Sequence, residues 1–319
     1  DGVLIADCWA DMAWFSQNEG GAIYMRNSAT ATLKNCTIRN CKALDYGGGI
    51  YMEDDGNSLT CENVTMTACV AEENFGGAVH QDRGGTTWVG GVIKKCRAND
   101  DDGGAFYQDD GEAFFRDIAF ESNYSDGSGG VLYCNTDDKT WFINCTMNGN
   151  SAKNYGGAVY MNKDYFYVED CRITGNSAGS QGGGVWVNDI GSIDVCGVVV
   201  IDNNSGAGDY DNLIMDDGAY FYDHGLRHGS KIKMRSDTTG TISLSEDSIS
   251  EFKLGKYIFG DNCELILDEM QLRSTKLSAS VFTDGSTVLY VGAAIILLFL
   301  TGGLLYAGKR RRGGKQHEK

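Results

Sequence analysis

The chain has 319 residues, a formal net charge of −17, 44 glycines, 11 cysteines and no proline. Hydrophobic residues make up 42% of it, which is a globular composition and excludes a wholly disordered chain. The excess of acidic residues would repel a phosphate backbone, so the sequence predicts no nucleic-acid partner.

A glycine pair followed by alternating residues occurs seven times along the chain. The pairs begin at residues 20, 47, 76, 103, 129, 156 and 182. The first copy reads GGAIYMRN and the sixth reads GGAVYMNK. A regular period of this size indicates a repeat architecture, and the absence of proline leaves every backbone N–H group available for a continuous sheet.

Apolar and polar residues alternate within each repeat, which is the pattern of strands with one buried face. One predicted inward column follows the glycine pairs: Ile23, Ile50, Val79, Phe106, Leu132, Val159 and Val185. A second is Ile38, Met66, Ile93, Phe120, Met147, Ile173 and Val200. A third lies two positions earlier and comprises Cys8, Cys36, Val64, Gly91, Ile118, Cys145, Cys171 and Val198.

These repeats are too short to hold a helical crossover, so each coil must stack on the next, with parallel strands about 4.8 Å apart. We therefore predict an all-β fold, a right-handed parallel β-helix of about eight coils over residues 1–215. The glycine pairs would form tight corners where a Cβ atom would clash. The first residues already match a coil, so we expect further coils upstream of Asp1.

A second motif accompanies the glycine pairs, as FESN at 120–123, MNGN at 147–150 and ITGN at 173–176. Together the two motifs resemble the GGAI and FxxN repeats of the polymorphic outer-membrane protein family, over residues 1–215. The resemblance implies a pectin-lyase-like right-handed parallel β-helix and the role of a surface adhesin. The chain departs from the family pattern after these repeats, where it carries one predicted transmembrane helix.

A column of small side chains lies three residues after each apolar anchor: Cys41, Cys69, Cys96, Asn123, Asn150, Asn176 and Asn203. We predict that it points inward, with amides hydrogen-bonded from coil to coil and thiols filling the same space. Neighbouring Cβ atoms in such a column are about 4.8 Å apart, whereas a relaxed disulfide needs about 3.8 Å. The thiols should therefore be mainly unbridged, with Cys145–Cys171 or Cys41–Cys69 as exceptions.

Five asparagines stand in Asn-X-Ser/Thr sequons, which are acceptors for N-glycosylation. Asn35, Asn63 and Asn144 share a predicted outward position, so they are the candidate glycan carriers. Asn123 and Asn203 fall in the predicted inward column, where a sugar cannot fit.

The residues beside the first inward column are aromatic or histidine: Tyr24, Tyr51, His80, Tyr107, Tyr133, Tyr160 and Trp186. Two residues further on come Arg26, Glu53, Asp82, Asp109, Asn135, Asn162 and Asn188. Alternation places both columns on the outer face, where rings and polar tips can hold a sugar. The predicted partner is an extracellular polysaccharide or a neighbouring surface protein. Alternatively, the rings only stabilise the sheet or lie under a loop.

Acidic residues gather on the same sheet and on the turn that follows it. The candidate metal ligands are Glu53, Asp54, Asp82, Asp109 and Asp110. These carboxylates would repel one another, and bound Ca²⁺ would remove the repulsion. A solvated acidic turn needs no metal, so both interpretations stay open. No cofactor is required, and Ca²⁺ is the candidate.

The expected fold is shared with pectate lyases and polygalacturonases, so a Ca²⁺-dependent polysaccharide lyase or a glycoside hydrolase is the alternative function. Asp82, Asp109 and Asp110 would then supply carboxylates, and Arg83 the basic side chain. An acidic column meets the carboxylate spacing of a glycosidase by accident, and a fold does not imply catalysis. The favoured prediction therefore assigns no catalytic residues.

Residues 216–286 lose the repeat, and we expect an irregular cap and a spacer there. Within 287–308, the charge-free run VLYVGAAIILLFLTGGLLYA is long enough for a transmembrane helix. The basic tail 309–319 then lies in the cytoplasm and the preceding chain outside. Because no signal peptide precedes Asp1, the native start is expected upstream.

These features together predict a single-pass protein of the plasma membrane and cell surface. Its outer β-helix is expected to act in adhesion, carbohydrate binding or surface structure. The polysaccharide lyase or hydrolase remains the alternative.

Overall fold

The computed structural model describes residues 1–11, 18–207, 209–237, 241–244, 255–261, 263–268 and 271–276. Every element in these ranges is a β-strand, and all of them belong to one compact unit, Asp1–Lys276. The same ranges contain no helix that is long and apolar enough to cross a membrane. The predicted transmembrane helix (287–308) and basic tail (309–319) lie outside the described residues.

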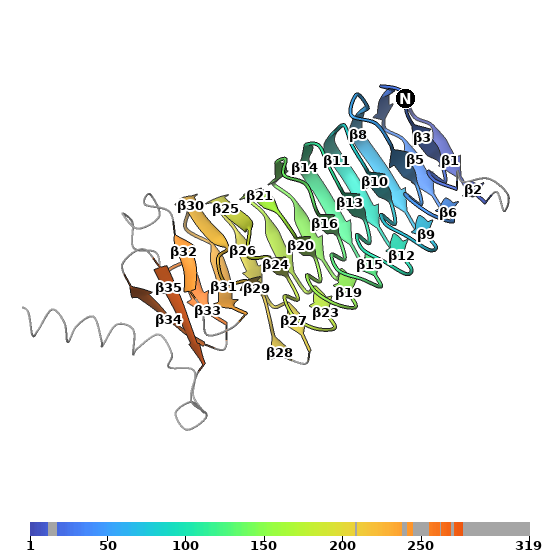
Figure 1. The fold of residues 1–319 in the computed structure, drawn as a ribbon. Helices are drawn as coiled ribbons and strands as arrows, with labels where there is room; N and C mark the ends of the chain where they lie inside the picture. Colours follow the sequence, from blue (N-terminus) through green and yellow to red (C-terminus); the bar gives the residue numbers. More distant parts are fainter. Residues whose placement is uncertain are drawn as a thin grey trace, which may run out of the picture. The chain divides into compact units, whose positions relative to one another are not determined.

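Seven coils begin with a three-residue strand after a glycine pair, and an eighth has the equivalent strand after Asp211 and Asn212; these strands are called the GG strands. They are β3 (Ile23–Met25), β7 (Ile50–Met52), β10 (Val79–Gln81), β13 (Phe106–Gln108), β16 (Leu132–Cys134), β20 (Val159–Met161), β24 (Val185–Val187) and β29 (Leu213–Met215). Each pairs in parallel with its counterparts in the adjacent coils. Figure 1 shows the coils stacked side by side in chain order.

The chain then runs through a second and a third strand, which form one bent strand in β8 (Ser58–Thr67), β11 (Gly85–Lys94) and β14 (Ala113–Glu121). The separate second strands are β4 (Thr30–Lys34), β17 (Thr140–Ile143), β21 (Asp164–Glu169), β25 (Gly191–Gly197) and β30 (Tyr220–Leu226). The separate third strands are β1 (Leu4–Ala6), β5 (Thr37–Arg39), β18 (Thr146–Asn148), β22 (Arg172–Thr174), β26 (Val200–Asp202) and β31 (Lys231–Ser236).

Two-residue strands complete the coils and form a sheet of their own. They are β2 (Trp9–Ala10), β6 (Lys42–Ala43), β9 (Val70–Ala71), β12 (Arg97–Ala98), β15 (Tyr124–Ser125), β19 (Ser151–Ala152), β23 (Ser177–Ala178), β27 (Ser205–Gly206) and β28 (Asp209–Tyr210). All of their pairings are parallel except that of β27 with β28. The all-β parallel solenoid predicted from the repeat is therefore confirmed.

The glycine pairs form corners for two different reasons. Gly47 has a φ of 60°, a left-handed conformation that favours glycine. Gly48 needs its missing side chain instead, because a Cβ atom there would lie 2.3 Å from the backbone carbon of Val70 in the next coil. The corner predicted from the sequence thus combines a backbone conformation with a close approach of two coils.

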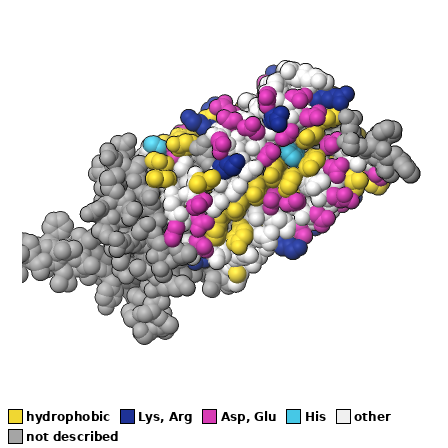
Figure 2. Space-filling model, in the orientation of Figure 1, with side chains coloured by type: hydrophobic (Ala, Val, Ile, Leu, Met, Phe, Trp, Pro, Cys, Tyr) yellow, Lys and Arg dark blue, Asp and Glu magenta, His cyan; other side chains and the backbone are white. Residues whose placement is uncertain are grey.

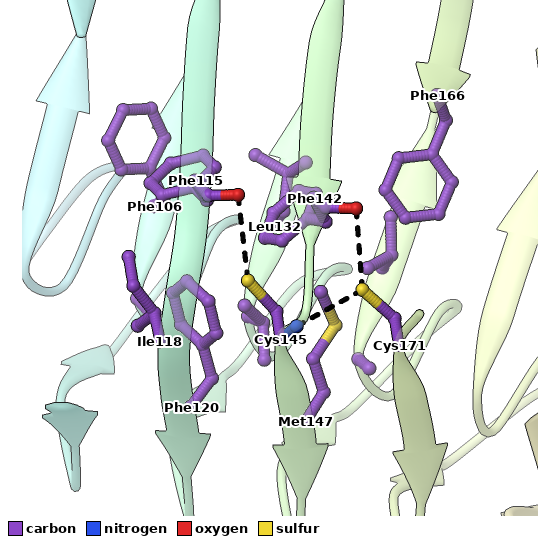
Figure 3. Close-up of a cluster of buried hydrophobic side chains, with 14 of the residues drawn as sticks. Phe106, Phe115, Ile118, Phe120, Leu132, Phe142, Cys145, Met147, Phe166 and Cys171 are labelled. Atoms are coloured by element: carbon purple, nitrogen blue, oxygen red, sulfur yellow. Dashed lines mark hydrogen bonds between the residues drawn. The ribbon is translucent and has the colours of Figure 1, made fainter. Parts of the chain in front are cut away.

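The interior is packed with aromatic, aliphatic and sulfur-containing side chains from successive coils (Figure 3). The rings of Phe115 and Phe142 stack with centroids 4.7 Å apart. The thiol of Cys145 lies 3.6 Å from the Phe115 carbonyl oxygen, and that of Cys171 lies 3.3 Å from the Phe142 carbonyl oxygen. The ten cysteines whose side chains the structure describes are all free, as expected for most of them. The exceptions proposed for Cys145–Cys171 and Cys41–Cys69 were wrong.

The inner column of thiols and amides is present, with two changes of membership. It comprises Cys8, Cys41, Cys69, Cys96, Asn123, Asn150, Asn176, Asn204 and Asn212. Cys8 was assigned to another column, but the pairing of Trp9 with Lys42 aligns it with Cys41. Asn203 was predicted in this column, but it is exposed on a corner with a φ of 57°, and Asn204 takes its place.

The same one-residue shift affects the other two columns in this coil. Ile173 pairs with Ile201 rather than with the predicted Val200, so Val199 replaces Val198 as well. Ile201 and Val199 are both fully buried. The cause is one additional residue after β25, where the chain turns at Gly197 with a φ of 71°.

Coil length varies most in the loop between the GG strand and the second strand. The aligned core residues Cys61 and Trp88 lie ten and eight residues after Tyr51 and His80, respectively. From these core residues to the third-strand residues Met66 and Ile93, the spacing is five residues in both coils. In these two coils the extra residues therefore enter the loop and leave the strand register unchanged.

Parallel pairing continues beyond residue 215, the predicted end of the repeats. Strand β30 pairs with β25, β31 with β26, and β33 (Ile258–Gly260) with β31. The last strands differ, because β35 (Gln271–Lys276) pairs antiparallel with both β32 (Thr241–Leu244) and β34 (Cys263–Asp268). The region expected to be an irregular cap thus includes regular strands in its described parts.

Candidate functional site

The aromatic column predicted from the glycine-pair segments lies along one edge of the solenoid. Strand pairing aligns its members in seven consecutive coils: Tyr24, Tyr51, His80, Tyr107, Tyr133, Tyr160 and Trp186. We call these residues the aromatic row. Tyr107 and Tyr133 have ring centroids 5.1 Å apart, and Tyr133 and Tyr160 have centroids 5.0 Å apart. From Tyr24 to Tyr160 the row is therefore a continuous series of rings, and Tyr155 connects Tyr160 to Trp186.

A second layer of rings lies against parts of the aromatic row. Tyr46, Phe75 and Tyr155 each precede a glycine pair. Phe75 stacks on Tyr107 at 4.3 Å between centroids, and Tyr155 packs against Trp186 at 4.8 Å. The corresponding residues of the two coils between them are Asp102 and Ser128, so the row has no aromatic cover there.

Burial divides the aromatic row into covered and accessible members. Tyr51, His80, Tyr107 and Trp186 are 5–9% exposed, whereas Tyr24, Tyr133 and Tyr160 are half-buried. Burial lowers the pKa of His80 to about 3, so this imidazole is neutral. The row thus has a packed spine and three tyrosines that reach the surface, and its role in binding a sugar stays a prediction.

An amide ladder runs beside the accessible part of the row. The side-chain nitrogen of Asn135 donates to Asp109 at 2.8 Å, that of Asn162 donates to Asn135 at 2.7 Å, and that of Asn188 donates to Asn162 at 2.9 Å. A primary amide has two N–H donors and two acceptor lone pairs. Each amide within the ladder therefore keeps donor and acceptor capacity for a ligand. An oblique band of hydrophobic side chains crosses the face shown in Figure 2, with acidic side chains on both sides.

The predicted metal ligands have separate partners instead of a common centre. Glu53 accepts a hydrogen bond from the Tyr24 hydroxyl, and Asp54 accepts one from the backbone N–H of Asn27. Asp110 accepts one from the Gly111 backbone N–H. In the part of the chain that the structure describes, no group of three or more His, Cys, Asp or Glu residues is arranged to hold a metal ion.

The residues assigned to the alternative enzyme lie along the same edge. Asp82 is half-buried, and burial raises its pKa, with Arg83 opposing the shift. Arg83 also forms an ion pair with Asp55 at 3.6 Å. Asp109 is engaged in the amide ladder, and Asp110 is exposed. No observation on these described residues favours the lyase or hydrolase.

Sequence reasoning missed an acidic pair beside the accessible tyrosines. Asp102 accepts a hydrogen bond from the Ser128 backbone N–H at 2.5 Å, and burial raises its pKa to about 7. Burial also raises the pKa of its neighbour Asp101. The available signal was the position of Asp102 directly before a glycine pair, where other coils carry an aromatic ring.

The three predicted glycan carriers lie on the corner between the second and third strands. Asn35, Asn63 and Asn144 are exposed and have φ values of 51°, 53° and 52°. Asn123 is 1% exposed, in agreement with its predicted inward position. Asn203 was expected to be inaccessible to a sugar, but it is exposed, so its sequon is open to modification as well.

Two protein families match parts of the chain. The right handed beta helix region matches residues 14–92, and the Chlamydia polymorphic membrane protein repeat matches residues 117–135 and 144–162. The repeat matches include the FESN and MNGN motifs. No curated protein and no solved structure matches the chain.

Proposed function

Because the chain is a β-helix of the polymorphic membrane protein type, we propose that it is a surface adhesin that binds an extended polysaccharide along the aromatic row. Repeats of this type point to a cell-surface or outer-membrane protein. The adhesive role and the ligand are inferred from the geometry of the row. Catalysis is not part of the proposal, because Asp109 and Asp110 already accept hydrogen bonds and Arg83 pairs with Asp55.

The single observation that carries the proposal is the pairing of accessible rings with an amide ladder. Tyr133 and Tyr160 are half-buried, and their ring centroids lie 5.0 Å apart. Asn135 and Asn162 follow two residues later, directly after the strands that carry these tyrosines. Aromatic rings stack on the C–H faces of sugars, while amides bond to their hydroxyl groups. Because both features repeat with the coil, they suit a ligand that is itself a repeating chain.

The proposal is tested by measuring the binding of the full chain to a panel of immobilised polysaccharides. We expect the wild type to bind at least one of these polysaccharides. The Tyr133→Ala variant should bind the same polysaccharide about tenfold more weakly, because the substitution removes one stacking ring. Trp9→Ala is the control, since Trp9 is 64% exposed on β2, outside the row. Equal binding by the wild type and Tyr133→Ala would contradict the proposal. Release of reducing sugars that is lost in Asp109→Asn would favour the enzyme instead.

Membrane attachment through the apolar run 288–307 is a further part of this proposal. The run lies outside the described residues, so the support comes from its length and from the basic residues that follow it. The full chain should enter the detergent phase of a Triton X-114 separation, and a chain that ends at residue 286 should stay in the aqueous phase. Partition of both forms into the aqueous phase would exclude the anchor.

A further inference from the structure

A second group of aromatic side chains lies outside the aromatic row, on β21, β25 and β30. Strand pairing forms two outward columns there, Tyr165–Ser192–Tyr220 and Tyr167–Asp194–Tyr222. Tyrosines on two coils therefore flank a coil that carries only the smaller side chains of Ser192 and Asp194. We call Tyr165, Tyr167, Tyr220 and Tyr222 the tyrosine cluster.

Members of the tyrosine cluster are among the most exposed large hydrophobic side chains of the described residues. Tyr165 is 40% exposed and Tyr220 is 48% exposed. The Tyr222 ring lies 6.5 Å from that of Tyr165 and 6.1 Å from that of Tyr220, measured between centroids. Rings from two different coils thus approach each other above the intervening polar residues. Exposed aromatic surface of this kind marks a binding site more often than isolated exposed residues do.

Asp194, on the coil between the two that carry the tyrosines, has unused hydrogen-bonding capacity. Asp194 Oδ2 lies 3.2 Å from His224 Nε2, and the His224 ring lies 6.2 Å from the Tyr222 ring at an angle of 5°. Asp194 Oδ1 is buried and has no hydrogen-bond partner among the described residues. Burial raises the pKa of Asp194, while His224 opposes the shift. A buried acceptor without a donor is uncommon in folded proteins and calls for an explanation.

We propose that the tyrosine cluster and Asp194 form a second binding site, which takes a neutral pyranose unit of a glycan. The C–H face of the sugar stacks on Tyr165 and Tyr220, and a sugar hydroxyl donates to Asp194 Oδ1 when the flanking rings move apart. The site shares no residue with the aromatic row. It therefore does not depend on the proposed function of that row.

The charges around the cluster favour a neutral ligand. Asp194 needs a hydrogen-bond donor, whereas a carboxylate or sulfate would bring further acceptors and negative charge. A cationic ligand would compete with Lys139, whose Nζ already lies 6.0 Å from the centroid of the Tyr165 ring. A sugar hydroxyl supplies the donor without a net charge.

The proposal is tested by nitrating the full chain with tetranitromethane and locating the modified tyrosines by peptide mass spectrometry. The neutral probes are galactomannan, xyloglucan and mixed-linkage β-glucan, with polygalacturonate as the anionic probe and chitosan as the cationic one. At least one neutral polysaccharide should slow the nitration of Tyr165 and Tyr220 by about threefold or more, as expected for a site that is mostly occupied. The charged probes should not slow it.

Two variants make the test specific. Asp194→Ala should abolish the protection of Tyr165, whereas Trp9→Ala should retain it. If Asp194→Ala does not fold, Tyr220→Ala replaces it, because Tyr220 is largely exposed and its ring is a proposed contact. The proposal is overturned if no neutral probe protects Tyr165 and Tyr220, if protection persists in the folded variant, or if polygalacturonate protects best. Nitration of Tyr133 and Tyr160 reports separately on the aromatic row.

Discussion

The inner column has two halves that occupy the same position in the coil and bond differently. In the amide half, Asn150 Oδ1 accepts from the backbone N–H and from the side-chain nitrogen of Asn123, at 2.9 and 3.0 Å. Asn150 also donates to the Phe120 carbonyl oxygen at 3.0 Å. In the thiol half, Cys41 and Cys96 approach carbonyl oxygens two residues back in their own coils, at 3.4 and 3.5 Å. The thiols also form weak hydrogen bonds with one another from coil to coil, whereas only the amides bond through their side chains to the backbone of the neighbouring coil as well.

The two halves show that the coil does not need the amides for its register. Parallel pairing is continuous through Cys69 and Cys96 as it is through Asn123 and Asn150. Both residue types have small side chains that are buried, since Cys69 is 0% and Asn150 1% exposed. The amides therefore add axial hydrogen bonds to a stack that packing already defines. The two halves should differ in how much stability a single side chain provides.

The largest effect is expected for Asn150→Ala. This substitution leaves two donors of Asn123 and the carbonyl oxygen of Phe120 without their partners in the buried interior. The free energy of unfolding should fall by about 3 kcal/mol, because each buried polar group left unpaired is costly. Urea denaturation of the full chain measures it. A loss below about 1 kcal/mol would show that the axial bonds contribute little.

A smaller loss is expected for Cys69→Ala, the matched change in the thiol half. Cys69 is equally buried, but its thiol lies 3.9 Å from the Thr67 carbonyl oxygen and otherwise bonds only weakly to the thiols of Cys41 and Cys96, so packing is the main contribution that is lost. The free energy of unfolding should fall by about 1 kcal/mol, measured by the same denaturation. If it falls as far as in Asn150→Ala, the distinction between the two halves fails.

The smallest effect is expected at the end of the amide half, and it depends on pH. Asp261 Oδ2 accepts from the backbone N–H and the side-chain nitrogen of Asn212, at 2.6 and 3.0 Å. Burial raises the pKa of Asp261 above its ordinary value of 3.8, and the bonds from Asn212 oppose the shift. A carboxyl with a raised pKa destabilises the fold as pH rises above the value for the unfolded chain.

Asp261→Asn keeps an oxygen for Asn212 and removes the buried charge. We expect the variant to be more stable than the wild type by about 0.5 kcal/mol at pH 7. The difference should disappear below pH 3.8, where the carboxyl is protonated in both states. Melting temperatures of both proteins across this pH range provide the measurement. A variant that is less stable at pH 7 would contradict the expectation.

The fold was predictable because the coil repeats its own pattern. Seven glycine pairs and the alternation around Ile38 and Met66 were enough to place the strands and the aromatic row. The one-residue shift before Asn204 was not predictable, because Asn203 is also an asparagine and preserves the usual spacing. Only the turn at Gly197 shows that the additional residue enters before this point.

The alignment of the aromatic row was also predictable, but its burial was not. Alternation places Tyr107 outside the core, yet Phe75, which precedes a glycine pair, covers it. The tyrosine cluster was missed for another reason. Tyr165 and Tyr222 come from distant parts of the sequence, and Tyr222 lies beyond the last clear glycine-pair repeat.

The loop between the GG strand and the second strand absorbs most differences in coil length. It begins directly after the GG strand that carries the aromatic row and ends before the buried residues Cys61 and Trp88. The loop residues next to the aromatic row are thereby separated from the buried strand residues that stabilise the fold. Insertions confined to these loops should change ligand preference at little thermodynamic cost, which gives a lineage a simple route to diversify its surface.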